Sequence, residues 1–234
     1  MTAAASVFIT GTDTGIGKTR ISCALLLALR QRGFSATGMK PVASGAQWQN
    51  GAWCNDDVEQ LRACSSLPLA ERELINPYAL RAPIAPELAA REQHTKISLR
   101  RLRAAHRALA AHADWVVVEG VGGWEVVFTD EYMQADLVRS LKLPVILVVG
   151  IRLGCINHAL LSARAIRGDD CRLLGWIANH IDPEMAATNA VVANLAERLP
   201  VPLLAELPFG CEPSEMAPRL AATMAAMAAA VSVQ

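Results

Sequence analysis

Short continuous runs of apolar residues alternate with longer amphipathic stretches along most of the chain. The apolar runs are rich in Val, Ile and Leu and lack strict alternation with polar residues, which is typical of parallel strands buried on both faces. The strands expected from these runs are 7–10, 35–39, 115–119, 145–149, 173–178 and 203–207. The helices expected from the amphipathic stretches are 18–32, 56–66, 98–112, 133–141, 156–167, 184–199 and 216–230.

Strands separated by helices indicate βαβ units. We therefore predict an α/β fold with a doubly wound, mostly parallel sheet and helices on both faces. No repeat, linker or change of composition divides the chain, so residues 1–234 are expected to form a single domain. Residues 68–91 contain four prolines and are expected to be irregular, and a long irregular segment in a compact domain is often a binding loop.

Composition narrows the class of protein. With 53% hydrophobic residues the chain is too apolar for a disordered protein. Its 22 basic and 22 acidic residues give no net charge, which argues against binding nucleic acid through bulk charge. No basic segment precedes an apolar run at the N-terminus, and the alanine-rich stretch 221–233 is too short to span a bilayer. Six cysteines without a Cys-x-x-Cys pair indicate thiols in a reducing compartment, so we expect a cytoplasmic protein that does not bind membranes.

The most informative motif is Gly11-Thr-Asp-Thr-Gly-Ile-Gly-Lys-Thr19, between the first expected strand and the first expected helix. Such a loop turns its backbone N–H groups toward a phosphate, while Lys18 reaches the β- and γ-phosphates and the Thr19 hydroxyl can bind Mg²⁺. The strict pattern requires glycine at position 12, where this chain has Thr12. The motif therefore predicts a variant phosphate-binding loop of the P-loop NTPase type.

Two other expected strands end in charged residues at the same edge of the sheet. Glu119 ends one strand before a Gly120-Val-Gly-Gly123 turn and is a candidate for handling Mg²⁺. Lys40 ends another, and Pro41 favours an extended backbone there, so Lys40 could stabilise a transferred phosphate or remain a solvated charge. Asp56 and Asp57 either contribute to this site or only cap the helix that follows.

Four segments in order along the chain resemble the dethiobiotin synthetase family: residues 11–19, Lys40-Pro-Val-Ala-Ser-Gly45, Val118-Glu-Gly-Val-Gly-Gly-Trp124 and Gly154-Cys-Ile-Asn-His-Ala-Leu160. The similarity extends to about residue 215. It implies a P-loop NTPase fold and an ATP- and Mg²⁺-dependent reaction of biotin synthesis. In this reaction 7,8-diaminononanoate and CO₂ form a carbamate, ATP converts it to a carbamic–phosphoric anhydride, and the second amine closes the ring of dethiobiotin.

Matching positions imply the site residues. The implied catalytic residues are Thr14, Lys18 and Lys40, and the implied Mg²⁺ ligands are Thr19, Asp57 and Glu119, with Asp57 matching better than Asp56. The implied substrate-binding residues are Ser44, Gly154, Cys155, Ile156 and Asn157, the last four from the neighbouring subunit of a homodimer. The implied ATP-binding residues are Gly15, Ile16, Gly17, Lys18, Thr19, Arg20, Asp57, Glu119, Gly120, Val121, Gly122, Asn179, Pro208, Phe209, Gly210 and Glu215.

The chain departs from the family pattern at three places. It has Gly15 where some relatives have Glu, Glu87 where His is frequent, and Glu125-Val-Val where a proline is usual.

The sequence leaves two alternative functions open. One is a partition- or septum-type switch ATPase, although those proteins start the loop with Lys-Gly-Gly. The other is a cobyrinate-type synthetase, although those normally carry an additional glutaminase domain.

Overall fold

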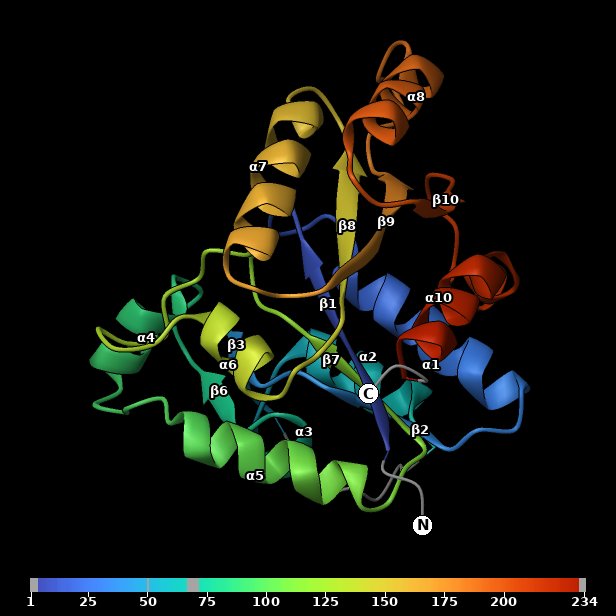
Figure 1. Ribbon diagram of the computed structural model, residues 1–234. Helices are drawn as coiled ribbons and strands as arrows, with labels where there is room; N and C mark the ends of the chain where they lie inside the picture. Colours follow the sequence, from blue (N-terminus) through green and yellow to red (C-terminus); the bar gives the residue numbers. More distant parts are fainter. Residues whose placement is uncertain (1–3, 50, 67–71, 232–234) are drawn as a thin grey trace.

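A central sheet of six strands organises the protein, whose computed structural model describes residues 4–49, 51–66 and 72–231 (Figure 1). The strand order is β10-β9-β8-β1-β7-β2, and all neighbouring strands are parallel. The bounds are β1 (Ala5–Gly11), β2 (Ala36–Met39), β7 (Trp115–Glu119), β8 (Val145–Ile151), β9 (Leu173–His180) and β10 (Leu203–Leu207). All six predicted strands are confirmed: the bounds of β7 and β10 agree with the prediction, and the ends of the other four differ from it by at most two residues.

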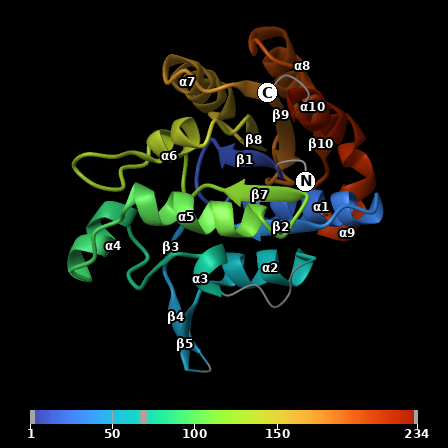
Figure 2. The ribbon, with the colours of Figure 1, turned by 60° about the horizontal axis from the view of Figure 1, so that its bottom comes forward.

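Alternate side chains of the central strands enter the two apolar cores on opposite faces of the sheet. In β1, Phe8 belongs to one core, and Val7 and Ile9 belong to the other. The longer helices that contribute to the first core include α5 (Leu99–Ala110), α6 (Gln134–Ser140), α7 (Cys155–Gly168) and α8 (Thr188–Arg198). Those that contribute to the second are α1 (Lys18–Gln31), α9 (Pro213–Met216), η1 (Ala217–Leu220) and α10 (Ala221–Val231) (Figure 2). This is the predicted doubly wound α/β architecture.

Residues 42–92 contain short elements that the sequence pattern did not predict. They are β3 (Val42–Ser44), β4 (Gln47–Gln49), β5 (Ala52–Cys54), α3 (Arg72–Ile75), β6 (Tyr78–Leu80) and α4 (Pro86–Glu92), beside the predicted α2 (Asp56–Cys64). Strands β3 and β6 pair in parallel, and the β4–β5 hairpin projects from the body (Figure 2).

The prediction that residues 68–91 are irregular is therefore wrong for 72–75, 78–80 and 86–91 and correct for 76–77 and 81–85, while 68–71 lie outside the described residues. These elements have only a few residues each, which is too short for a hydrophobic period to develop. Pro86 does not break α4 because it lies in the first turn, where its missing N–H would have no helical partner.

Two helix boundaries also differ from the prediction. Helix α8 begins at Thr188 rather than at residue 184, because Ala187 has a left-handed backbone with φ of 57°. The predicted helix 216–230 is divided, since Pro218 lies in the 3₁₀ turn η1 that precedes α10. Both differences come from local backbone geometry.

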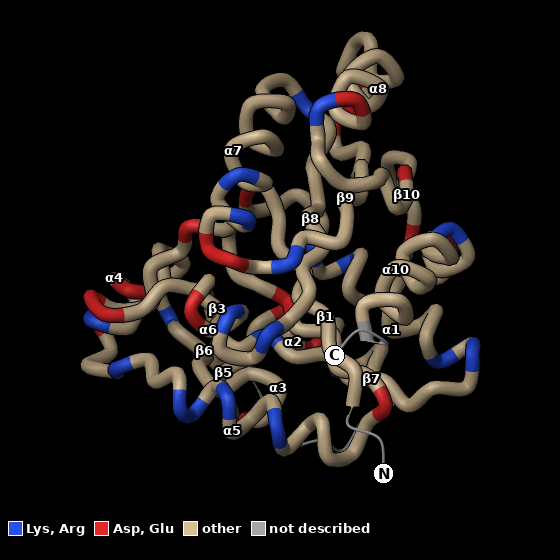
Figure 3. Tube along the Cα trace, viewed as in Figure 1, with Lys and Arg blue, Asp and Glu red and all other residues tan. Residues whose placement is uncertain are grey.

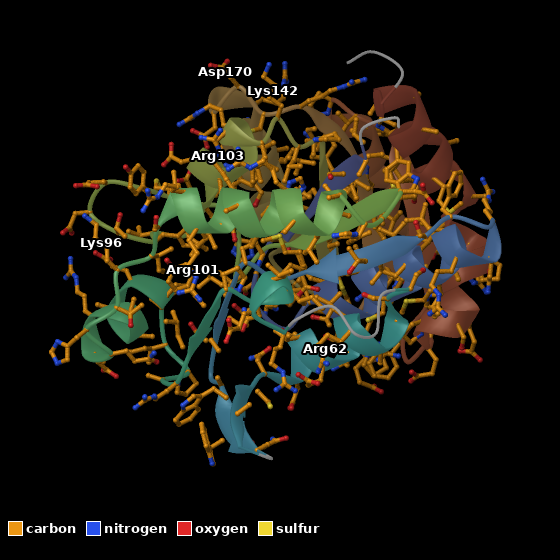
Figure 4. The ribbon with its side chains drawn as sticks, turned by 90° about the horizontal axis from the view of Figure 1, so that it is seen from below. Arg62, Lys96, Arg101, Arg103, Lys142 and Asp170 are labelled. Carbon is orange, nitrogen blue, oxygen red and sulfur yellow. The ribbon has the colours of Figure 1, made fainter. Side chains whose placement is uncertain are left out.

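The surface charge is uneven although the chain is neutral overall. Helix α5 contains no acidic residue and exposes Arg100, Arg101, Arg103 and Arg107 (Figure 3). Arg101 and Arg103 leave this helix on opposite sides, and the Arg101 guanidinium lies 4.8 Å from the centre of the Tyr78 ring (Figure 4).

Among the described residues, no helix has the length and apolar character needed to cross a bilayer.

The sheet topology creates a crevice at the carboxyl end of β1. From β1 the chain crosses to β2 and returns through β7 on one side, whereas β8, β9 and β10 add on the other side. Such a reversal of strand order separates the loops that follow neighbouring strands. The phosphate loop after β1 and the Gly120–Gly123 turn after β7 both reach this crevice.

Candidate active site

The phosphate loop between β1 and α1 has the backbone of an anion-binding loop. Gly15 and Gly17 have left-handed φ values of 73° and 89°. A Cβ atom on Gly17 would lie 2.3 Å from Asn179 Nδ2, so both conformation and space require glycine there. In the described structure no side chain caps α1, which leaves the N–H groups of its first turn available to a phosphate.

Lys18 lies at the centre of this loop and is almost completely buried. Its Nζ donates to the backbone carbonyl of Asp13 at 2.7 Å. Burial lowers the pKa of Lys18 to about 8, although the negative charge of Glu119 opposes the shift. A bound phosphate would compensate this buried charge and return the pKa toward its ordinary value.

A second lysine joins two carboxylates from different elements. Lys40, the residue after β2, donates from Nζ to Glu119 Oε1 at 2.7 Å and also to Asp57 Oδ2. Thr19 Oγ1, in the first turn of α1, donates to the same Glu119 oxygen at 2.8 Å. The fold thus brings together the ends of β2 and β7 with the first turns of α1 and α2.

The helix-cap alternative for the two aspartates is resolved by Asn55. Its side chain accepts from the backbone N–H of Asp57 at 3.1 Å and is the N-cap of α2. The Asp57 side chain is therefore free to turn toward Lys40, whereas Asp56 is exposed.

The pKa values reflect this pairing. Burial alone would lower the pKa of Lys40, but the charges of Glu119 and Asp57 outweigh burial and raise it. Burial alone would raise the pKa of Asp57, but Lys40 outweighs burial and lowers it. Lys40 and Asp57 are therefore both charged at neutral pH.

The residues around Glu119 fit a magnesium ion that is shared with a nucleotide. Glu119 Oε2 is buried and has no hydrogen-bond partner within the described residues, and Thr19 and Asp57 supply further oxygen atoms. Mg²⁺ is usually held by one or two carboxylates together with substrate phosphates and water. The described part of the chain has no cluster of three or more His, Cys, Asp or Glu residues that could hold a metal ion.

A cavity of about 940 Å³ begins at these groups and extends away from the phosphate loop. The implied site residues that line it are Thr14, Gly15, Gly17, Lys18, Thr19, Arg20, Lys40, Ser44, Asp57, Glu119, Val121 and Gly122. The Ser44 hydroxyl is buried without a hydrogen-bond partner in the described structure. An unpartnered buried hydroxyl in a cavity wall is available to a ligand.

The sequence motifs missed part of this cavity. The rest of its lining consists of residues 83–88 and 125–127, together with Asn55 and Gln60. The prolines at 83 and 86 are the signal that pointed to a binding segment there, but they did not indicate which side chains face the cavity. This part of the lining exposes Ile84, Leu88 and Val127, which makes it largely apolar.

Five implied ATP-binding residues from the C-terminal part of the chain do not line this cavity: Asn179, Pro208, Phe209, Gly210 and Glu215. Asn179, at the end of β9, donates from Nδ2 to the carbonyl of Ile16 at 2.7 Å. Arg20 donates to the carbonyl of Gly210 at 3.2 Å and so ties the 208–210 turn to α1. Glu215 accepts from the backbone N–H of Glu212 at 2.9 Å, in the first turn of α9. The structure therefore places Asn179 against the phosphate loop and the 208–210 turn against α1.

The implied substrate loop also lies outside the cavity of its own chain. Residues 154–157 form the start of α7, where Gly154 is a left-handed N-cap with φ of 90°. The preceding Leu153 is 93% exposed, and Arg152 forms an ion pair with Asp13 of the phosphate loop. Cys155 is buried, whereas Asn157 is exposed.

Sequence comparison finds close relatives along nearly the whole chain. A family model described as "AAA domain" matches residues 5–215. The "ATP-dependent dethiobiotin synthetase BioD" of Aromatoleum aromaticum is 51% identical over 223 residues, which cover 94% of this chain and 98% of that protein. The protein of the same name from Xylella fastidiosa is 52% identical over 216 residues, which cover 91% of this chain and 95% of its own length.

Structural comparison finds the same fold in more distant proteins. The MinD cell division protein of Aquifex aeolicus matches with a TM-score of 0.56 and 16% identity, over 98% of this chain and 97% of that one. A ParA family ATPase from Chlorobium tepidum matches with a TM-score of 0.57 and 10% identity, over 99% of this chain and 100% of that one. Identities this low show a shared P-loop fold only.

Proposed function

The chain belongs to the family of ATP-dependent dethiobiotin synthetases, and we propose that it makes dethiobiotin in the cavity beside its phosphate loop. As a member of this family the protein is an ATP-dependent ligase of biotin synthesis. Its substrates are proposed to be 7,8-diaminononanoate, CO₂ and ATP. The convergence of Lys18 and Lys40 on one cavity, with the unpartnered Ser44 hydroxyl in its wall, supports this site most directly.

Phosphate binding is assigned to the loop and the start of α1. The N–H groups between Gly15 and Thr19 surround the β- and γ-phosphates, and the Lys18 ammonium leaves the Asp13 carbonyl to neutralise them. Asn179, Arg20 and the 208–210 turn hold the base beside α1. Thr19, Asp57 and Glu119 hold Mg²⁺, which supplies positive charge to the phosphate oxygens when it is bound.

The first chemical step needs positive charge and positioning rather than a protein nucleophile. One amine of the substrate attacks the carbon of CO₂ and loses a proton, and the product is a carbamate with a negative oxygen. Lys40 attracts this oxygen, while Thr14 and Ser44 orient the group from neighbouring cavity walls. The carbamate oxygen then attacks the γ-phosphorus, and ADP leaves.

Ring closure completes the reaction. The second amine attacks the carbonyl carbon of the carbamic–phosphoric anhydride, inorganic phosphate leaves, and the amine loses a proton. Lys18 and Lys40 stabilise the negative charge that develops on the phosphate and carbonyl oxygens. Both lysines are buried at this cavity, where a charge interacts more strongly than in water.

The distant carboxylate of the substrate is assigned to residues 154–157 of a second copy of the chain. The N-terminus of α7 presents N–H groups suited to a carboxylate, and the exposed Leu153 beside it is available for contact with another subunit. This assignment requires a homodimer.

We further propose that the enzyme works in the cytoplasm, since its six cysteines are free thiols.

The deciding experiment measures phosphate release from MgATP and bicarbonate with and without 7,8-diaminononanoate, and identifies the product by mass. We expect phosphate release that depends on the diamine and a product with the mass of dethiobiotin. Phosphate release that is indifferent to the diamine would instead indicate a switch ATPase. Activity that requires glutamine as a nitrogen donor would indicate a cobyrinate-type ligase.

A further inference from the structure

Four carboxylates line the cavity, and their environments differ. Asp57 and Glu119 are paired with Lys40, and Glu87 is paired with Arg91 at 2.7 Å. Glu125 is exposed and makes no hydrogen bond or ion pair within the described part of the chain. The cavity therefore has one wall that offers a negative charge without a partner.

The backbone holds Glu125 in a fixed position at this wall. On one side, Trp124 is buried and donates from Nε1 to Asp169 Oδ2 at 2.7 Å. On the other side, the N–H of Val126 donates to the carbonyl of Trp124 at 2.8 Å, and the Val126 carbonyl accepts from the N–H of Gln134 at 2.8 Å. Glu125 is thus the central residue of a three-residue turn that is anchored at both ends.

This turn and the phosphate loop both approach Gly122. A Cβ atom on Gly122 would be 3.2 Å from Val126 Cγ2 and 3.8 Å from Thr14 Oγ1, so Gly122 lies close to both Val126 and Thr14. Val126 and Val127 continue the cavity wall next to Glu125. Glu125 therefore shares one cavity with the place proposed for phosphoryl transfer and with apolar side chains suited to a methylene chain.

The chemistry of the substrate supplies a partner for this charge. An aliphatic amine, like the side chain of lysine, is protonated near neutral pH. When one amine of a diamine has become a carbamate, the other still enters the site as an ammonium group. We propose that Glu125 binds this ammonium group and thereby favours a diamine over a substrate without a second amine.

This inference rests on the proposed function and predicts how loss of the Glu125 carboxylate changes the kinetic constants. The ammonium group must lose its proton before it attacks, so its contact with Glu125 belongs to the bound substrate rather than to the ring-closing transition state. Loss of a contact that is made only in the bound state weakens substrate binding, so it raises KM without lowering kcat. Because Glu125 is exposed, its attraction for the ammonium group is also screened by salt.

The test compares Glu125→Gln with Glu92→Gln in the full-length enzyme. Glu92 is an exposed carboxylate at the end of α4 and does not line the cavity, so it controls for loss of a surface charge. For Glu125→Gln we expect KM for 7,8-diaminononanoate to rise about five- to tenfold, with KM for MgATP unchanged. In the wild type the KM for the diamine is expected to rise with ionic strength. In Glu125→Gln this rise is expected to be smaller.

A second probe separates recognition of the amine from a general disturbance of the cavity. Nonanoate has the chain and carboxylate of the substrate but no amine, so its inhibition constant is expected to be equal in wild type and Glu125→Gln. Equal increases in the KM for the diamine, the inhibition constant of nonanoate and the KM for MgATP would indicate a structural role for Glu125 and overturn the inference. A diamine KM within about twofold of wild type in Glu125→Gln would also overturn it.

These outcomes are distinct from failure of the proposed function. If the wild-type enzyme makes no dethiobiotin, the proposed function fails and the inference fails with it. If the wild type makes dethiobiotin and only the effect of Glu125→Gln is missing, the function stands and the inference alone is wrong.

Discussion

Lys40 has a central position in the site, and its contact with Glu119 also stabilises the folded protein. The side chain of Glu119 is completely buried, and Lys40 is the positive group that bonds to its carboxylate. A buried carboxylate whose partner is removed destabilises the folded state strongly. Lys40 therefore maintains the folded site in addition to its proposed contact with the carbamate.

The two tasks of Lys40 can be separated with variants of similar size. Lys40→Met is expected to abolish turnover and to lower the free energy of unfolding by about 3 kcal/mol, because Glu119 is left buried without its partner. Adding Glu119→Gln should restore most of that stability but no turnover. Urea unfolding and diamine-dependent phosphate release measure the two effects. A stable, active Lys40→Met enzyme would contradict both assignments.

Lys18 gives the binding of nucleotide a characteristic pH dependence. Its pKa is about 8 in the free protein and should rise when phosphate is bound. Binding of MgATP at pH 8 is therefore expected to take up about half a proton, and binding well below that pH to take up almost none. Calorimetric titrations in buffers of different ionisation enthalpy measure this uptake. Lys18→Met should remove it, and uptake that persists in the variant would show that another group titrates.

At the scale of elements, the contact between α5 and β1 couples stability to pH. His106 of α5 is buried, and its Nε2 lies 3.0 Å from Ser6 Oγ of β1. Its Nδ1 has no hydrogen-bond partner in the described structure. Burial lowers the pKa of His106 to about 4 from its ordinary 6.5, so the folded protein keeps this ring neutral over that range.

The sign of the effect follows from the difference in proton binding. Between pH 6.5 and about 4 the unfolded chain binds a proton on His106 and the folded chain does not, so stability falls as the pH falls through this window. The contribution of His106 is expected to decrease by about 2 kcal/mol from about pH 7.5 to about pH 5. Urea unfolding at both pH values should show a smaller decrease in His106→Gln, while the exposed His112→Gln should behave like wild type.

At the scale of the whole molecule, the proposed homodimer has a direct test. If residues 154–157 serve the site of the other subunit, each site combines Lys40 from one chain with Asn157 from its partner. Asn157 is exposed, so Asn157→Trp should block the loop without disturbing the core. Lys40→Met and Asn157→Trp should each be nearly inactive alone.

Mixing the two variants is expected to restore activity. Half of randomly formed dimers contain one chain of each kind, and each mixed dimer has one intact site, so the mixture should regain about a quarter of wild-type activity. The samples are unfolded together, refolded and assayed for phosphate release. Complete failure to regain activity, although the mixed dimer is present by mass, would show that the loop serves its own chain.

The sequence by itself determined the architecture, the phosphate loop and the family. The six strands of the sheet are continuous apolar runs, and the longer helices keep one apolar face, so local pattern was sufficient for them. The Gly11–Thr19 motif is also local, because one turn of backbone supplies all its groups.

Only the tertiary structure decided which side chains meet. The pairing of Lys40 with both Glu119 and Asp57 joins residues 79 and 17 positions apart, and no local pattern specifies such contacts. The short elements in 72–91 owe their form to the core they pack on, since Tyr78 and Leu80 are buried there. Glu125 could likewise be singled out only from the tertiary structure. Whether a carboxylate has an ion-pair partner depends on which side chains the fold places near it, and the other cavity carboxylates have such partners.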